Sequence, residues 1–549
     1  MSSIATPAIG RRAWLAAAAA APLGTLAACA PRPEAAGWGS RWVGASHERG
    51  HRLRGEAPAG AGSPAPTRRA GVLVVGAGVA GLAAARALAR SGVDDVHVFD
   101  LEDAPGGNSR GHQLGGMACP LGAHYLPVPD EHAIEVIALL EDLGLRRTEH
   151  GRPVYDEGHL CHSPQERLFI DAHWHEGLLP PIDALPAAQR APTLDQYRRF
   201  GAAVARAGAF RIPSARAAWT EAHASLDRVT FAAWLDAQRF DAPALRWYLD
   251  YCCRDDYGAG AAQVSAWAGV HYFASRHGFH APGAGGDERE AVLTWPQGNA
   301  WLTARLAEPL RDRVHTGCVV QRVAAGRHDV DVDLWNEAAR RAERWTAPQV
   351  IMAVPLFVAL RVLGAAPPAL RDAVAAMRHA PWLVANLHLA SPLDDRPGAP
   401  PSWDNVLYAS PALGYVDAMH QSTRPHPGPT VLTAYWALGG DSPAQLQAQR
   451  QRLLDESAAV WAQAVVQDLA RAHADLPGRV QQIDLMRYGH AMSVPVPGVR
   501  GSAALRALAE EPGRIRFAHT DLSGYSVFEE AMYQGTRAAA AVLGKRAYA

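Results

Sequence analysis

A glycine-rich segment near residue 76 constrains the fold of this chain more than any other feature. The apolar run 72–75 leads directly into Gly76, Gly78 and Gly81, which have the spacing Gly-x-Gly-x-x-Gly. In a strand–turn–helix unit the first glycine permits a tight turn, the second lets the backbone approach a pyrophosphate, and the third lets helix and strand pack closely. The pattern predicts a parallel sheet with a dinucleotide at the amino end of a helix.

An acid follows the glycines at the distance expected for ribose binding. Residues 82–90 have the composition of a helix, and a second apolar strand at 96–99 ends in Asp100, nineteen residues after Gly81. An acidic side chain at this position accepts hydrogen bonds from the ribose hydroxyls of a dinucleotide. We therefore expect the glycines, Ala80 at the start of the helix and Asp100 to bind a cofactor.

The segment after Asp100 resembles the flavin-containing amine oxidase superfamily, to which phytoene desaturases and protoporphyrinogen oxidases are related. It carries a Gly-Gly pair, Gly106-Gly107, and Arg110 shortly after it. The resemblance implies FAD as the cofactor, with this loop beside it. The family usually has arginine directly after Gly-Gly, where this chain has Asn108, so Arg110 is the expected phosphate contact.

The resemblance continues to the carboxyl end of the chain. Residues 514–518, then Asp521 and a predicted helix from about 528 to 541, are similar to the closing motif of the family. The resemblance places Asp521 near the ribityl-phosphate region and the start of this helix, with Val527, near the flavin ring. It adds Val319, within a predicted strand at 314–323, to the FAD contacts. No cysteine lies near the closing motif, so non-covalent FAD is expected.

These motifs predict an α/β fold in which a discontinuous Rossmann-type FAD-binding domain is combined with an α+β substrate domain. We assign residues 70–130, 291–370 and 486–549 to the FAD-binding domain, and 131–290 and 371–485 to the substrate domain. Within the substrate domain we expect an amphipathic helix at 133–143, strands at 382–389 and 431–436, and a helix at 442–470. Its aromatic residues are expected mainly in the core, with a cage for an amine as the alternative; they are Trp247, Tyr248, Tyr251, Tyr257, Trp267, Tyr272 and Phe273.

The first 29 residues have the pattern of an export signal. Arg11-Arg12 precedes an alanine-rich apolar run, which resembles a twin-arginine signal, and Leu26 to Cys29 resembles the lipobox of bacterial lipoproteins. Residues 30–69 are rich in Pro, Gly and Arg and are expected to form a flexible tether. The sequence thus predicts a periplasm-facing protein of the bacterial cell envelope that is held at the membrane by a lipid on Cys29.

The charge balance bears on the partners of the protein. Fifty-three basic and 54 acidic side chains give a net charge of -1, so the composition does not suggest a nucleic-acid partner, and a small-molecule substrate is expected. The chain contains one lysine, Lys545. Many members of the superfamily use a lysine to hold a water at the flavin, a few residues beyond the proline that corresponds to Pro355. This chain has no lysine there, and the neighbouring basic residue is Arg361. The absence of that lysine favours an electron acceptor other than oxygen.

The candidate catalytic residues are His124, His490 and Arg361. The resemblance places both histidines near the flavin ring, where imidazoles can handle protons. The glutamates at 529 and 530 either pair with a cationic substrate or favour the helix dipole, and the cysteines lack the spacing of a metal site. The resemblance implies oxidation of a C–N bond of an amine. Two alternatives are dehydrogenation of a C–C bond in an apolar substrate and a non-catalytic nucleotide-binding protein of the envelope.

Overall fold

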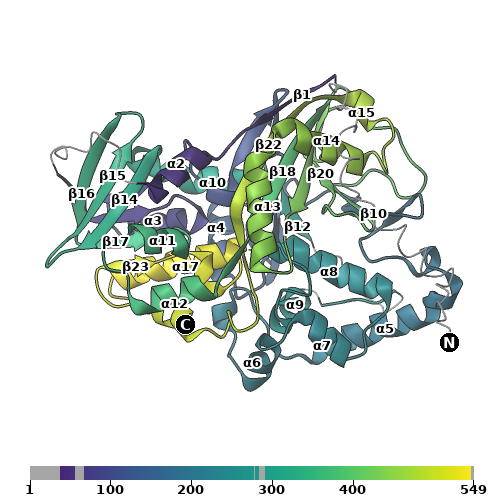
Figure 1. Cartoon of the computed structure of the whole chain (residues 1–549), viewed down its shortest axis with the longest axis horizontal. Coiled ribbons are helices and arrows are strands. Elements are labelled where there is room, and N and C mark those ends of the chain that lie inside the picture. The colour runs from purple at the N-terminus through teal and green to yellow at the C-terminus, as the bar shows by residue number, and fades with distance from the viewer. Residues whose placement is uncertain (1–36, 56–66, 277, 283–290, 546–549) are drawn as a thin grey trace, which may run out of the picture.

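The computed structural model describes residues 37–55, 67–276, 278–282 and 291–545. The predicted signal and lipobox lie outside these residues. Figure 1 shows a parallel sheet beside a much larger sheet, with a group of helices beneath the larger one. The fold is the predicted combination of a dinucleotide-binding domain with a second, α+β domain.

The dinucleotide-binding domain is built on a five-stranded parallel sheet. Its strand order is β13 (Val314–His315), β4 (Val96–Phe99), β3 (Val72–Val75), β17 (Gln349–Met352) and β23 (Ile515–Phe517). All four residues of β3 are buried, as expected for a parallel strand that is covered on both faces. Segments from both ends of the chain therefore meet in one sheet, which confirms that the domain is discontinuous.

Two layers cover this sheet. One apolar cluster contains residues of α3 (Val79–Arg90), α4 (Ile134–Asp142), α10 (Ala300–Ala307) and α17 (Phe528–Val542). The opposite cluster contains residues of the antiparallel strands β14 (Cys318–Ala325), β15 (Val330–Asn336) and β16 (Arg341–Ala347), and of α11 (Leu356–Val362), α12 (Pro368–Ala376) and α16 (Ala503–Ala509). Strand β2 (Arg68–Arg69) pairs with β16 in parallel at the edge of this antiparallel sheet.

The second domain contains an eight-stranded sheet. Its order is β1 (Gly39–Trp42), β22 (Val480–Val494), β18 (Arg378–Leu389), β21 (Thr430–Ala437), β20 (Tyr415–Asp417), β19 (Asp404–Leu407), β10 (Glu166–Ile170) and β11 (His173–Glu176). Strand β18 lies antiparallel to both β21 and β22. The two strands predicted in this region are therefore confirmed as neighbours in one sheet.

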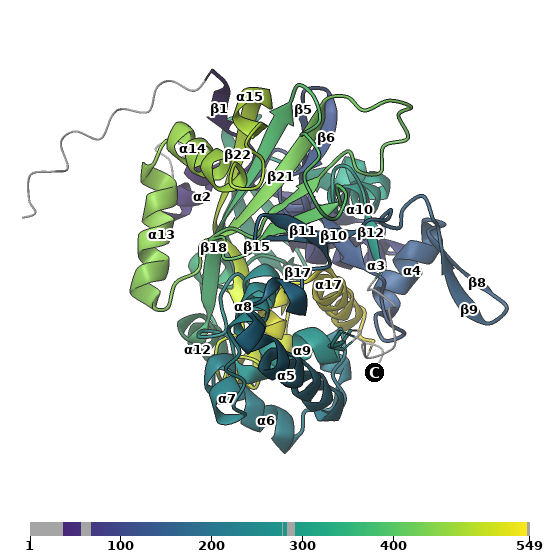
Figure 2. The same ribbon diagram turned by 90° about the vertical axis from the view of Figure 1, so that its right-hand side faces the viewer.

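Helices pack on both sides of the large sheet. One group comprises α5 (Ala187–Arg206), α6 (Glu221–Asp227), α7 (Phe231–Ala237), α8 (Pro243–Tyr257) and α9 (Ala266–Ala274). The other comprises α13 (Pro443–Asp455), α14 (Ala458–Leu469) and α15 (Leu476–Arg479). Figure 2 shows the two groups well separated. The predicted helix 442–470 is thus two helices, because Ser457 caps α14 after a break.

Three two-stranded pairs and one short helix complete the described α-helices and strands. The two-stranded pairs are β5 (Gly111–Leu114) with β6 (Met117–Pro120), β7 (Tyr125–Pro127) with β12 (Val292–Thr294), and β8 (Arg146–Glu149) with β9 (Arg152–Tyr155). The helix is α2 (His47–His51). Most of the aromatic residues singled out above belong to the core around α8 and α9 or pack against it, as the simpler interpretation predicted.

The structure corrects two domain boundaries. Helix α4 packs against α17 in the core of the dinucleotide-binding domain, so that domain does not end at residue 130. Strand β22 runs from Val480 to Val494, so the boundary at 486 divides a strand that belongs to the large sheet. Both errors have one cause: an amphipathic helix or a strand pattern does not reveal which domain its apolar face joins.

The tether predicted for residues 30–69 is also wrong over the part that is described. Strand β1 pairs in parallel with β22, and the side chain of Arg41 forms two hydrogen bonds to the buried Asp484, both at 2.9 Å. After α2, the carbonyl of Leu53 accepts a hydrogen bond from Arg361. This segment is therefore packed on both domains.

Within residues 37–55, 67–276, 278–282 and 291–545, no helix combines the length and the apolar character needed to cross a membrane.

Candidate active site

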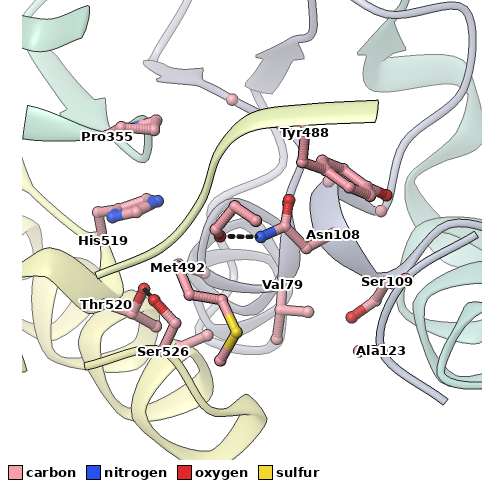
Figure 3. Close-up of a pocket in the computed structure, with 18 of the residues that line it drawn as sticks. Val79, Asn108, Ser109, Ala123, Pro355, Tyr488, Met492, His519, Thr520 and Ser526 are labelled. Carbon is pink, nitrogen blue, oxygen red and sulfur yellow. Dashed lines mark hydrogen bonds between the residues drawn. The ribbon is translucent and has the colours of Figure 1, made fainter. Parts of the chain in front are cut away.

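A cavity of about 410 Å³ lies where the two domains meet. The dinucleotide-binding domain contributes the glycine turn, the Gly106-Gly107 loop, the segment at Pro355 and the start of α17. The second domain contributes parts of β18, β21 and β22 and the end of α8. Figure 3 shows residues of both domains converging on this space.

The glycine turn supplies a cradle that a side chain would fill. Gly76 has a φ of +101°, and a Cβ there would lie 2.3 Å from the carbonyl oxygen of Ala353. A Cβ on Gly81 would lie 1.9 Å from the carbonyl oxygen of Gly76, so Gly81 packs helix on strand and does not face the cavity. Gly78 and Ala80 do line the cavity. Gly78 caps α3 without a side-chain hydrogen bond, which leaves amides for an anion.

The Gly-Gly loop approaches this turn directly. A Cβ on Gly107 would lie 3.2 Å from the Cα of Gly78, and both Gly106 and Gly107 line the cavity. The side chain of Asn108 donates a hydrogen bond to the carbonyl of Ala491 on β22, as Figure 3 shows. Asn108, which departs from the family pattern, therefore ties the loop to the second domain.

Asp100 and Val319 lie at the cavity wall, as predicted. The carboxylate of Asp100 accepts hydrogen bonds from the amides of Ala77 at 2.7 Å and Glu102 at 2.9 Å. Burial raises its pKa, which these amides oppose. Asp100 therefore holds the glycine turn in place and also faces the cavity.

Arg110 is not placed as expected. Its guanidinium forms an ion pair with Asp103 at 2.5 Å, and Arg110 is not among the residues that line the cavity. The attraction of this nearby carboxylate is the physical reason for the difference. The Nε and Nη1 atoms of Arg110 are nevertheless buried without a hydrogen-bond partner beneath the Gly-Gly loop.

The closing motif also lies at the cavity. Asp521 and Val527 both line it. Asp521 is fully buried and accepts hydrogen bonds from the amide of Leu356 and from the side chains of Ser493 and His379. Burial alone would raise the pKa of Asp521, but His519 and His379 together hold it well below its usual value. Asp521 thus joins β22, β18 and α11 beneath the cavity.

Together these features fit an FAD molecule. The cradle of glycines, the uncapped start of α3 and the acid at the end of β4 suit a pyrophosphate and an adenosine ribose. The same cavity is lined by the glycine turn and by the start of α17, so its wall joins both regions. The residues that would hold it are Gly76, Gly78, Ala80, Asp100, Gly106, Gly107, Val319, Asp521 and Val527.

His124 and His490 do line the cavity, as predicted. Burial lowers the pKa of each to about 3, and Arg450 contributes to the shift at His490. A base this weak does not take a proton from an ammonium group near neutral pH. The ring of His124 stacks on Tyr435 at 4.3 Å. These neutral imidazoles can therefore shape the site and form hydrogen bonds, whereas the expected proton transfer is not supported.

Arg361 is a clear correction. It lies on the exposed side of α11, donates to the carbonyl of Leu53 and does not line the cavity. The helical period turns it away from the buried residues Leu356 and Ala359. Lys545, the one lysine of the chain, lies beyond the end of α17. The described cavity wall thus contains neither Arg361 nor a lysine.

Part of the cavity wall is acidic, and its two aspartates were not predicted from the sequence. Asp255 and Asp256 at the end of α8 line the cavity together with Arg276 and Glu529. Arg276 forms an ion pair with Asp256 at 3.1 Å. Glu529 is 4% exposed; its carboxylate accepts a hydrogen bond from its own backbone amide and forms no ion pair among the described residues. Its position at a helix start suggested a simple role with the dipole, because sequence does not reveal burial.

Two carboxylates of this wall titrate near neutrality. Burial raises the pKa of Glu529 to about 7, although Arg276 opposes the shift. Burial, assisted by Asp256, raises the pKa of Asp255 to about 7. Groups with such pKa values can both attract an ammonium ion and accept its proton.

The fold and the cavity define an FAD-dependent oxidoreductase, and comparison with known proteins identifies its family. Residues 79–543 match the family described as flavin containing amine oxidoreductase. The chain belongs to this family.

Similar proteins support this assignment. A Mycobacterium tuberculosis protein named as the flavin-containing monoamine oxidase AofH is 27% identical over 290 residues, which are 52% of this chain and 56% of the relative. The match thus spans little more than half of that protein. A tryptophan 2-monooxygenase of Allorhizobium ampelinum is 37% identical over 67 residues, which are 12% of this chain and 9% of the relative.

Solved structures share the fold at low identity. A putrescine oxidase variant superposes with a TM-score of 0.63 at 20% identity, over 87% of this chain and 100% of the other. Cyclohexylamine oxidase from Brevibacterium oxydans gives 0.61 at 20% identity, over 86% and 99%. A protein described as a protoporphyrinogen oxidase from Exiguobacterium gives 0.59 at 15% identity, over 88% and 100%. The fold is therefore shared by enzymes with different substrates.

Proposed function

We propose that the protein oxidises a C–N bond of an amine. The observation that carries this proposal is Glu529, which is buried in the cavity wall and forms no ion pair among the described residues. A carboxylate in such a position is costly to ionise unless a cation compensates it. An apolar polyene would leave this cost in place, whereas an ammonium group would remove it.

The chain's own residues then have defined tasks. Glu529 would attract the ammonium ion and take its proton, because only the neutral amine can be oxidised. Tyr435 and His124 would pack against the carbon chain and exclude water. FAD, when bound, supplies a hydride acceptor. We propose that FAD is held without a covalent bond. Cys318 is the one cysteine in the described cavity wall, and it lies next to Val319 in β14 and not in the closing motif.

Anaerobic mixing with amines tests this proposal. We expect primary amines to bleach the visible absorbance of the bound flavin, and the rate to rise with pH as the ammonium ion is deprotonated. Glu529→Gln should slow this reduction by about tenfold or more at pH 7, because the proton acceptor is lost. Asp171→Asn, an exposed substitution in the β10–β11 turn, is the control. Bleaching by polyenes or porphyrinogens, with none by amines, would reject the proposal.

The electron acceptor is a separate proposal. No lysine lines the described cavity wall, and we propose that reoxidation by oxygen is slow. We also propose that the protein is exported to the periplasmic side and carries a lipid on Cys29, which would bring a membrane quinone within reach. We expect a soluble quinone to speed turnover by about tenfold over air. Stopped-flow reoxidation measures both rates, and rapid, stoichiometric peroxide formation in air would contradict this expectation.

A further inference from the structure

A second, smaller pocket of about 90 Å³ adjoins the cavity. The two spaces share wall residues, so the pocket opens beside the proposed amine site. The shared residues are His124, Tyr125, Pro127, Asp255, Arg276 and Tyr435. Glu166 of β10 and Asp404 of β19 line the smaller pocket alone. We call this space the side pocket.

The side pocket has acidic walls. Asp404 at the start of β19 lines it, and Asp255 lines it from α8. Neither carboxylate forms an ion pair or a side-chain hydrogen bond with a charged residue in the described part of the chain. Arg276 is the cationic side chain there, and it forms an ion pair with Asp256.

Aromatic rings form much of the remaining wall. Tyr251 and Tyr415 have their hydroxyls bonded to the carbonyl of Leu413 and to His473, at 3.2 and 2.8 Å. Tyr272 and Trp403 line the same space. Aromatic faces attract ammonium ions, and the attraction grows when water is excluded.

The electrostatics point to a missing positive charge. Burial, assisted by Asp256, raises the pKa of Asp255 to about 7. Burial, assisted by Asp255, raises the pKa of Asp404 well above its usual value. Two carboxylates that oppose each other's ionisation bind a cation between them favourably. Glu529 lies in the larger cavity and not in the side pocket, so it forms a separate acidic centre.

We propose that the side pocket binds the second ammonium group of an aliphatic diamine whose reacting amine lies near Glu529. This inference rests on the proposed amine oxidation. It adds a site, made by Asp404 and Asp255, that selects a dication over a monoamine of the same length.

Binding to the reduced holoenzyme tests the site apart from turnover. FAD reduced with dithionite cannot accept a hydride, so diamines bind without reaction. Calorimetry under anaerobic conditions at pH 8 would compare diamines of increasing length, from 1,4-diaminobutane upward, with monoamines of equal length. We expect the best diamine to bind at least about tenfold more tightly than its monoamine, which corresponds to about 1.4 kcal/mol.

Two variants locate the effect. Asp404→Asn should remove most of the diamine preference, and Asp255→Asn should do the same, whereas the exposed control Asp171→Asn should retain it. Circular dichroism and flavin content verify that each variant is folded. The site is refuted if wild-type protein binds diamine no more tightly than monoamine, or if both variants keep the full preference. If diamines bind selectively but no amine bleaches the oxidised flavin, the site stands and the proposed oxidation fails.

Discussion

Gly78→Ala is expected to lose about a hundredfold in FAD affinity, or about 2.7 kcal/mol, while the protein still folds. Gly78 has an ordinary backbone conformation, and the nearest atom to an added Cβ would be the Cα of Gly107 at 3.9 Å. The protein itself therefore tolerates the methyl group. The dinucleotide does not, because its pyrophosphate must approach this part of the backbone closely.

The measurement is a titration of apoprotein with FAD, in which the quenching of flavin fluorescence reports binding. Gly478→Ala is the matched control, since no atom lies within 4 Å of the added Cβ and no residue of α15 lines the cavity. Gly76 is unsuitable, because a Cβ there would clash with Ala353 and disturb the fold itself. Unchanged FAD affinity in Gly78→Ala, with wild-type circular dichroism, would disprove the assigned cradle.

The dinucleotide-binding domain was predictable because its signals are local. The glycine turn, β3, α3 and β4 follow each other within thirty residues, and each step has a backbone reason that sequence reveals. The closing helix was placed within one residue, at Phe528–Val542. Helix α4 was assigned to the wrong domain and strand β22 was divided between the two, because their partners, α17 and β18, lie far away in sequence.

The site was less predictable than the fold, since burial decides its chemistry. The sequence singled out His124 and His490 because an ordinary imidazole titrates near neutrality, but burial lowers the pKa of both to about 3. The same burial raises the pKa of Asp255 and Glu529 to about 7; the sequence did not point to Asp255, and it offered Glu529 as a substrate contact only as one of two alternatives. Desolvation thus exchanges the roles that residue type alone would assign.

The acidic wall should also cost stability, and Asp255→Asn measures that cost. The pKa of Asp255 is raised from 3.8 to about 7, so the folded protein holds a proton that the unfolded chain releases at lower pH. Its destabilising effect therefore grows as the pH rises above 3.8 and is complete above about pH 7. We expect Asp255→Asn to melt about 2 °C or more above the wild type at pH 8, with a smaller gain at pH 5.

A second buried acid supplies the opposite control. Asp484 is fully buried, but Arg41, His112 and Gln482 all bond to it; burial alone would raise its pKa, and these partners lower it below the usual value. Its ionised form stabilises the fold above pH 4, so Asp484→Asn should lower the melting temperature at pH 8. If Asp255→Asn also melts lower than the wild type at pH 8, Asp255 has a compensating partner in the free enzyme. The proposed link between this loss of stability and amine binding would then be wrong. A carboxylate that serves to bind a substrate cation should destabilise the protein while no substrate is bound.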